Sequence, residues 1–245
     1  MPESDSPTAA SPSRRRLFRA IVLAPVAAAG GAALVACERR QEAGGPGATA
    51  QPAATGPVFF TAKERDAVTA ICARLIPADA LGPGAVELGV PEFLDRHMQT
   101  PYAAGANWYR LGPFLEAPAS FGYQGPLALR DILRTGLAAL DAHVGRAFAG
   151  RTFAGLGPAD QDAVLRGAEA GTLKWPEISE KTFFGYLLSE VRNGFGADPI
   201  HGGNRDMGGW KAIDYPGVRA DYLDWVGVRD RPYPIPPVDM AGRRG

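Results

Sequence analysis

The densest group of side chains that could do chemistry lies between residues 194 and 217. His201, Asn204 and Asp206 fall within six residues of one another, with Arg205 among them. A histidine beside a carboxylate can transfer protons, so one hypothesis is an acid–base site on this segment. The same side chains also offer directional hydrogen bonds that could recognise another protein. Neither interpretation is excluded by the residue types alone.

The rest of this segment favours an ordered surface. Seven of its 24 residues are glycine, which costs backbone entropy on ordering and allows close approach of another backbone. Large apolar side chains accompany the glycines, and each gains about 1.5–3 kcal/mol when fully buried. The mixture predicts either a packed surface loop or a contact surface, since tryptophan and arginine often anchor interfaces. The candidate partner-interface residues are His201, Gly202, Gly203, Asn204, Arg205, Asp206, Trp210 and Tyr215.

Few groups in this sequence could hold a metal or a cofactor. There are three histidines and two cysteines, and neither H-E-x-x-H, C-x-x-C-H, G-x-S-x-G nor a phosphate-binding glycine pattern occurs. We therefore predict no catalytic, cofactor-binding or metal site in this chain. Cys72 shares an apolar helical face with Val68 and Ile71, so we expect a buried, unreactive thiol.

Charge and composition exclude further classes of function. Twenty-six basic and 26 acidic residues balance in a chain of 245, which gives no support to nucleic-acid binding. The 31 glycines and 22 prolines approach the level that indicates irregular structure. Of the aromatic residues, only Phe18 precedes residue 58. A segment without aromatic side chains buries little surface, so a packed core is expected only after residue 57.

Residues 1–36 have the pattern of an export signal. Arg14 and Arg15 lie in a basic region that precedes an uncharged run over 20–36. A basic region before a short apolar run is typical of a secretory signal, and the paired arginines match the twin-arginine (Tat) type, which exports folded proteins. An ordinary basic signal or an uncleaved anchor is the alternative. We predict export to the periplasm through the Tat translocase.

The apolar run ends in Leu34-Val35-Ala36-Cys37, which resembles a lipobox. Lipidation of Cys37 would hold the protein at the membrane surface, whereas cleavage at another position would leave it unanchored. Residues 37–57 are rich in glycine and proline and lack apolar periodicity. They predict a flexible linker between the export signal and the folded domain.

Residues 58–245 are predicted to form a single all-α domain with long glycine- and proline-rich ordered loops. Thr61 and Glu64 fit a capping box, and the helix that begins there should end before Pro77. The longest helix should follow Pro126, where apolar residues recur with a period of 3.6. No segment alternates apolar and polar residues over the length of a strand. Further helices are expected at 91–99, at 157–170 and from 179 onward, with weaker candidates at 108–115 and 216–226.

One long motif, from Asp198 to Gly217, resembles the signature of the gluconate 2-dehydrogenase subunit 3 family. The resemblance extends upstream to Phe60–Glu64, Gly89–Pro91 and Lys181–Phe184. With the Tat signal it covers nearly the whole chain. His201 departs from the family pattern, in which tyrosine usually precedes Gly-Gly-Asn.

This resemblance implies a non-catalytic small subunit. In the family, a large flavoprotein with bound FAD oxidises a sugar or a sugar acid, and electrons pass towards a cytochrome c subunit. The small subunit supplies the export signal and supports maturation, Tat export and stability of the flavoprotein. The implied partners are this FAD-containing large subunit, a cytochrome c subunit and the Tat translocase, with peripheral membrane association through lipid or partner. The alternatives are a lipid-anchored binding protein for another partner and an autonomous enzyme that uses the His201 loop.

Overall fold

The structure is a computed structural model that describes residues 59–115 and 117–245. All regular elements in these residues are helical, and backbone pairing of the β type is limited there to three isolated bridges. The predicted all-α class is therefore confirmed for this part of the chain. The predicted signal peptide, with Arg14 and Arg15, and the predicted linker with Cys37 lie outside the described residues.

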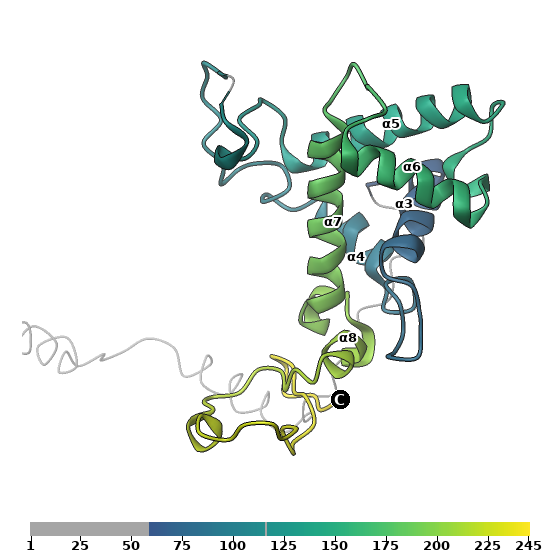
Figure 1. The fold of residues 1–245 in the computed structure, drawn as a ribbon. Coiled ribbons are helices and arrows are strands. Elements are labelled where there is room, and N and C mark those ends of the chain that lie inside the picture. The colour runs from purple at the N-terminus through teal and green to yellow at the C-terminus, as the bar shows by residue number, and fades with distance from the viewer. Residues whose placement is uncertain (1–58, 116) are drawn as a thin grey trace, which may run out of the picture. The chain divides into compact units, whose positions relative to one another are not determined.

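Six α-helices and several short 3₁₀ turns make up this fold (Figure 1). The α-helices of the described residues are α3 (Ala62–Leu75), α4 (Val90–His97), α5 (Leu129–Ala147), α6 (Pro158–Ala170), α7 (Glu180–Gly196) and α8 (Gly208–Ala212). The 3₁₀ turns are η1 (Ala119–Phe121), η2 (Phe153–Gly155), η3 (Pro199–His201), η4 (Arg205–Met207) and η5 (Leu223–Trp225).

The helix starts follow local capping rules. At α3, the Thr61 hydroxyl accepts a hydrogen bond from the backbone N–H of Glu64, whose carboxylate accepts one from the Thr61 N–H. This reciprocal pair satisfies two of the otherwise unpaired donors of the first turn. Ser179 caps α7 through the N–H of Thr182, and Pro158 occupies the first turn of α6, where its missing N–H costs nothing. These three predicted starts are confirmed.

Helix α7 is the element against which the others pack. It contacts α3, α4, α5 and α6, and Figure 1 shows α3, α4 and α6 beside it and α5 crossing its upper end. Phe183, Leu187 and Val191 form its buried face. Large apolar side chains of this kind contribute about 1.5–3 kcal/mol each when buried, so α7 carries a large share of the core.

Buried and half-buried polar side chains fix the ends of this core. Asp95 of α4 is buried, and its carboxylate accepts hydrogen bonds from the backbone N–H groups of Phe59 and Phe60 at 2.9 and 2.8 Å. Arg74 of α3 binds both carboxylate oxygens of Asp162 on α6, at 2.7 and 2.9 Å. The hydrogen-bonded guanidinium holds the pKa of Asp162 below its ordinary value.

Two of the weaker helix predictions are wrong. Residues 108–115 form no α-helix; Pro113 interrupts the pattern, and Leu111 stays exposed, so no buried face exists to stabilise a helix there. Within 216–226 only the turn η5 is helical. Conversely, the sequence did not predict α8, because five residues with two glycines show no measurable apolar period.

Cys72 lies in the core, as predicted. Its side chain is fully buried, and burial together with the negative charge of Glu92 raises the pKa of the thiol to about 12. A thiol with this pKa stays protonated at neutral pH and is a poor nucleophile. In the part of the chain that the structure describes, no helix is long and apolar enough to cross a membrane.

Candidate functional site

The segment from 194 to 217 folds against the C-terminal end of α7, and Trp210 anchors it there. Only 4% of Trp210 is exposed, and its indole N–H donates a hydrogen bond to the carbonyl of Gly196 at 2.8 Å. The ring of half-exposed Tyr215 meets the indole edge-on, with centroids 5.2 Å apart. Trp210 therefore acts inside the segment and presents little surface to a partner.

Asn204 ties two turns of the segment together. It is fully buried; its amide N–H donates to the carbonyl of Ala197, and its Oδ1 accepts from the N–H of Gly209, both at 2.8 Å. Because each end of the side chain has a partner within the segment, Asn204 is not available to a substrate. This residue has a positive φ of 45°, a conformation that asparagine tolerates better than most residues.

Glycines let the segment contact α7 through its backbone. A Cβ at Gly203 would lie 2.2 Å from the carbonyl oxygen of Gly194, and a Cβ at Gly209 would lie 2.3 Å from that of Phe195. Real Cβ atoms do not approach oxygen this closely, so only glycine fits at either position without movement of the backbone. The close backbone approach that the sequence suggested for this glycine-rich segment is thus found at two of its glycines.

The backbone after Asn204 is held in a strained form. Asp206 and Met207 both have positive φ, at 55° and 56°. A left-handed conformation costs a non-glycine residue about 1–2 kcal/mol. Such strain persists only where the surrounding contacts determine it, and it is often found at functional sites.

The charged candidates of the segment lie on its surface. His201, Arg205 and Asp206 are exposed. The Arg205 guanidinium donates to the carbonyl of Glu87 at 3.1 Å, and its backbone N–H donates to that of Leu88. The structure therefore does not assemble His201, Asn204 and Asp206 around one point, because Asn204 faces inward while the other two are exposed.

The C-terminal residues complete this site, and sequence reasoning missed them. Asp198 accepts a hydrogen bond from the N–H of Met240 at 2.8 Å, and the N–H of Val218 donates to the carbonyl of Val238 at 2.7 Å. A pocket of about 330 Å³ lies between the segment and the tail. No motif in the sequence relates positions that lie this far apart along the chain. The pocket is lined by Pro199, Asp206, Met207, Lys211, Asp239, Arg243, Arg244 and Gly245.

We expect the tail around Asp239 to loosen at acid pH. Burial alone would raise the pKa of Asp239, but hydrogen bonds from the backbone N–H and the guanidinium of Arg243, at 2.8 and 2.6 Å, bring it below its ordinary value. A carboxyl with a lowered pKa in the folded state stabilises that state above its unfolded pKa of about 3.9, and this stability is lost as the pH falls towards the folded value. NMR signals of Arg243 followed below pH 5 should show the transition.

Asp239→Asn should remove this pH dependence and already loosen the tail at neutral pH. The matched control is Asp214→Asn, since Asp214 is exposed. An acid transition that survives in Asp239→Asn would show that another carboxyl controls it.

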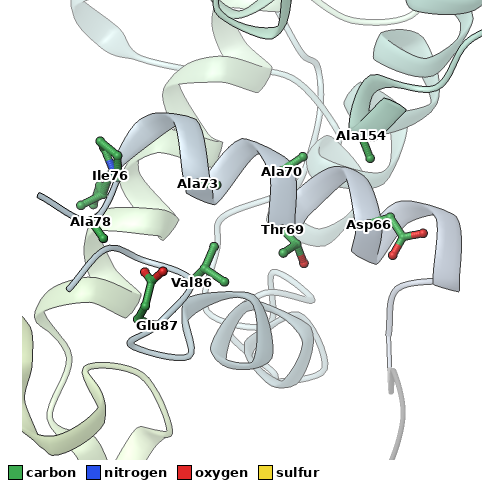
Figure 2. Close-up of a pocket in the computed structure, with 10 residues that line it drawn as sticks. Asp66, Thr69, Ala70, Ala73, Ile76, Ala78, Val86, Glu87 and Ala154 are labelled. Carbon is green, nitrogen blue, oxygen red and sulfur yellow. The ribbon is translucent and has the colours of Figure 1, made fainter. Parts of the chain in front are cut away.

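A second pocket runs along α3 (Figure 2). Its volume is about 450 Å³, and most of the side chains that line it are small or apolar. Asp66 lies at one end and Glu87 near the other in Figure 2. It contains no histidine or cysteine, and the described residues hold no cluster of three or more metal-ligating side chains. The lining residues are Asp66, Thr69, Ala70, Ala73, Ile76, Pro77, Ala78, Val86, Glu87 and Ala154.

A comparison with protein families covers α3 to α8 and the glycine-rich segment in a single match. A family profile described as gluconate 2-dehydrogenase subunit 3 matches residues 62–217, which is well over half of the chain. The matched range begins with the first residue of α3 and ends with Gly217. The chain belongs to the gluconate 2-dehydrogenase subunit 3 family. Comparisons with curated proteins and with solved structures gave no match.

Membership of the subunit 3 family confirms the resemblance found in the sequence. It makes this chain an accessory subunit of an oxidoreductase complex of the gluconate 2-dehydrogenase type, associated with other dehydrogenase subunits. The match ends before the tail over 218–245, although contacts such as Asp198–Met240 join that tail to the matched segment.

Proposed function

We propose that this subunit 3 protein is the non-catalytic small subunit of an exported, FAD-dependent sugar or sugar-acid dehydrogenase. It binds the folded flavoprotein and supports its maturation, Tat export and stability, while FAD and the oxidation chemistry belong to the partner. The family match over the helical core and the signature segment carries this proposal. The Arg14-Arg15 pair matches the twin-arginine signal and therefore supports the Tat route. This route exports folded proteins, as the export of an assembled flavoprotein would require.

The geometry of the signature segment supports the accessory role over the acid–base alternative. Asn204 and Trp210 use their polar atoms to hold the segment on α7, so these residues serve the fold of the subunit. In this proposal the complex is periplasmic, a cytochrome c subunit accepts the electrons, and lipidation of Cys37 or the partner holds the complex at the membrane.

Replacing the paired arginines tests the export route. In the native host, Arg14→Lys/Arg15→Lys should leave both this chain and the flavoprotein in the cytoplasm, because the pair is the recognised feature while the positive charge is retained. Fractionation with antibodies against each chain measures the result. Arg16→Lys is the matched control and should leave export unchanged.

Two outcomes would count against the proposal in different ways. Normal export of the Arg14→Lys/Arg15→Lys variant would show that the Tat route is wrong, while the proposed complex with the flavoprotein would still stand. If the wild-type chain, immunoprecipitated from the periplasm, brings down no flavin-containing chain, the subunit role in an FAD-dependent dehydrogenase is wrong.

A further inference from the structure

In the segment 109–121, here named the apolar arm, the large apolar side chains of the described residues are exposed. Tyr109, Leu111, Leu115 and Phe121 are 87%, 73%, 71% and 68% exposed. Four side chains of this size expose an apolar area of several hundred Å², roughly the size of the largest patch on a typical monomer. The arm has only two charged residues, Arg110 and Glu116, and depletion of charge with enrichment of aromatic residues is typical of the core of a protein interface.

The base of the apolar arm is fixed to the helical core. The Arg110 guanidinium donates to the carbonyls of Ala104 and Pro126, at 3.2 and 2.6 Å, and so ties the two ends of the arm together. The rings of Trp108 and Tyr123 lie on either side of the base, and each packs against Tyr186 of α7 with centroids 6.2 Å apart. A base held in this way lowers the entropy cost of ordering the arm on binding.

A second exposed apolar segment, residues 213–226, leaves the other end of α7 and is here named the C-terminal arm. Ile213, Leu223 and Val226 are exposed to a similar degree as the residues of the apolar arm. Trp210 joins the start of this arm to the last turn of α7 through Gly196. Figure 1 shows both arms projecting from α7 on the side away from α5 and α6.

One face of α7 is exposed in the part of the chain that the structure describes. Its exposed positions recur at helical spacing along the whole helix. Gly185 lies on this face and has no atom within 4 Å of the place where a Cβ would be. A glycine inside a helix costs about 1 kcal/mol relative to alanine, and no described residue comes close enough to require it there. The exposed positions are Lys181, Gly185, Ser189, Arg192, Asn193 and Gly196.

We propose that the two arms and the uncovered face of α7 between them form the docking surface for the large flavoprotein subunit. This inference rests on the proposed function. The apolar arm contacts the partner near Tyr186 of α7, and the C-terminal arm contacts it near Gly196. Between these two contacts, the surface of the partner lies directly on the helix at Gly185. The surface on the partner is correspondingly apolar at both ends.

The charges favour a protein over a lipid surface as the occupant. Anionic membranes attract segments rich in lysine and arginine. The only basic residue of the apolar arm, Arg110, is engaged with its own backbone, and the C-terminal arm has three acidic residues and one basic residue. The acidic C-terminal arm opposes binding to anionic lipid, and the low charge of the apolar arm suits the centre of a protein interface.

The test measures the complex recovered from the periplasm of the native host. Leu111→Ser/Leu115→Ser in the apolar arm and Leu223→Ser/Val226→Ser in the C-terminal arm should each lower the flavin recovered per captured chain at least tenfold. Leu81→Ser is the matched control, because Leu81 is 79% exposed but lies in the connection between α3 and α4. Since all five leucine and valine side chains are exposed, thermal unfolding of the variants should match that of the wild type.

The helix face has its own pair of variants. Gly185→Arg should block docking, whereas Gly145→Arg on α5 should not. The two variants are matched because a side chain added at either glycine would meet no atom within 4 Å of its Cβ. A photo-crosslinking residue at Tyr109 should then form a covalent adduct with the flavin-containing chain, and one at Leu81 should not.

Each result either supports or overturns the assignment. If the wild type recovers flavoprotein and all variants recover it equally, the docking surface lies elsewhere while the proposed function stands. If the wild type recovers none, the proposed function itself fails. If the arm variants recover flavin unchanged but lose binding to phosphatidylglycerol vesicles, the surface binds lipid and the assignment is wrong. If they recover flavin unchanged but lose dimerisation of the chain alone, the surface binds a second copy and the assignment is equally wrong.

Discussion

Asn204→Ala is expected to lower the free energy of unfolding by about 3–5 kcal/mol. The change removes two buried hydrogen bonds and leaves the carbonyl of Ala197 and the N–H of Gly209 without their partner. Each unpaired buried group costs about 1–3 kcal/mol. Alanine must also adopt the positive φ of this position, which adds about 1 kcal/mol or more. Urea denaturation followed by tryptophan fluorescence measures the loss, and Trp210 reports on the segment itself.

Asn204→Gly separates the two causes. Glycine loses the same hydrogen bonds but accepts positive φ without strain, so this variant should be about 1 kcal/mol more stable than Asn204→Ala. Equal stability of the two variants would show that the backbone strain is absent. A loss of less than 1 kcal/mol in both would show that the bridge from Ala197 to Gly209 does not hold the segment.

Gly203→Ala should destabilise the protein by about 2–4 kcal/mol. The added methyl group would lie 2.2 Å from the carbonyl oxygen of Gly194; the backbone fixes the position of both atoms, so no rotamer change can move them apart. Relief requires the segment to shift away from α7, which weakens the burial of Trp210, and overpacking of this kind typically costs 1–3 kcal/mol or more. Thermal and urea unfolding measure the effect.

Gly196→Ala is the control for Gly203→Ala. Gly196 lies in the same segment, is exposed, and has no atom within 4 Å of its Cβ position. Alanine there should change stability by less than about 0.5 kcal/mol or raise it slightly. If Gly196→Ala and Gly203→Ala had the same effect, the close backbone contact with α7 would be ruled out as the cause.

The helices could be predicted because their signals are local. The capping box of Thr61 and Glu64, the proline at 158 and the apolar period after Pro126 each act within a few turns of one helix. The family signature was equally visible as a continuous run. These features identify the fold class and most of the helix starts without knowledge of tertiary contacts.

The hydrogen-bond partners of the side chains in segment 194–217 could not be predicted in the same way. Asn204 and Trp210 were candidates for contact with a partner, whereas the structure uses their polar atoms on Ala197, Gly209 and Gly196. Whether a polar side chain faces a partner or its own chain depends on how the backbone turns, and here the positive φ values of Asn204, Asp206 and Met207 set the turns. Contacts such as Asp198–Met240 join residues whose sequence spacing carries no period.

The hydrogen bonds from Phe59 and Phe60 to Asp95 also have a mechanical consequence. They hold the two residues that precede the N-cap of α3 on the buried carboxylate of α4. A force applied to the chain at residue 59 would therefore act on Asp95 before it reaches α3, and the packing of α3 would be shielded from that force.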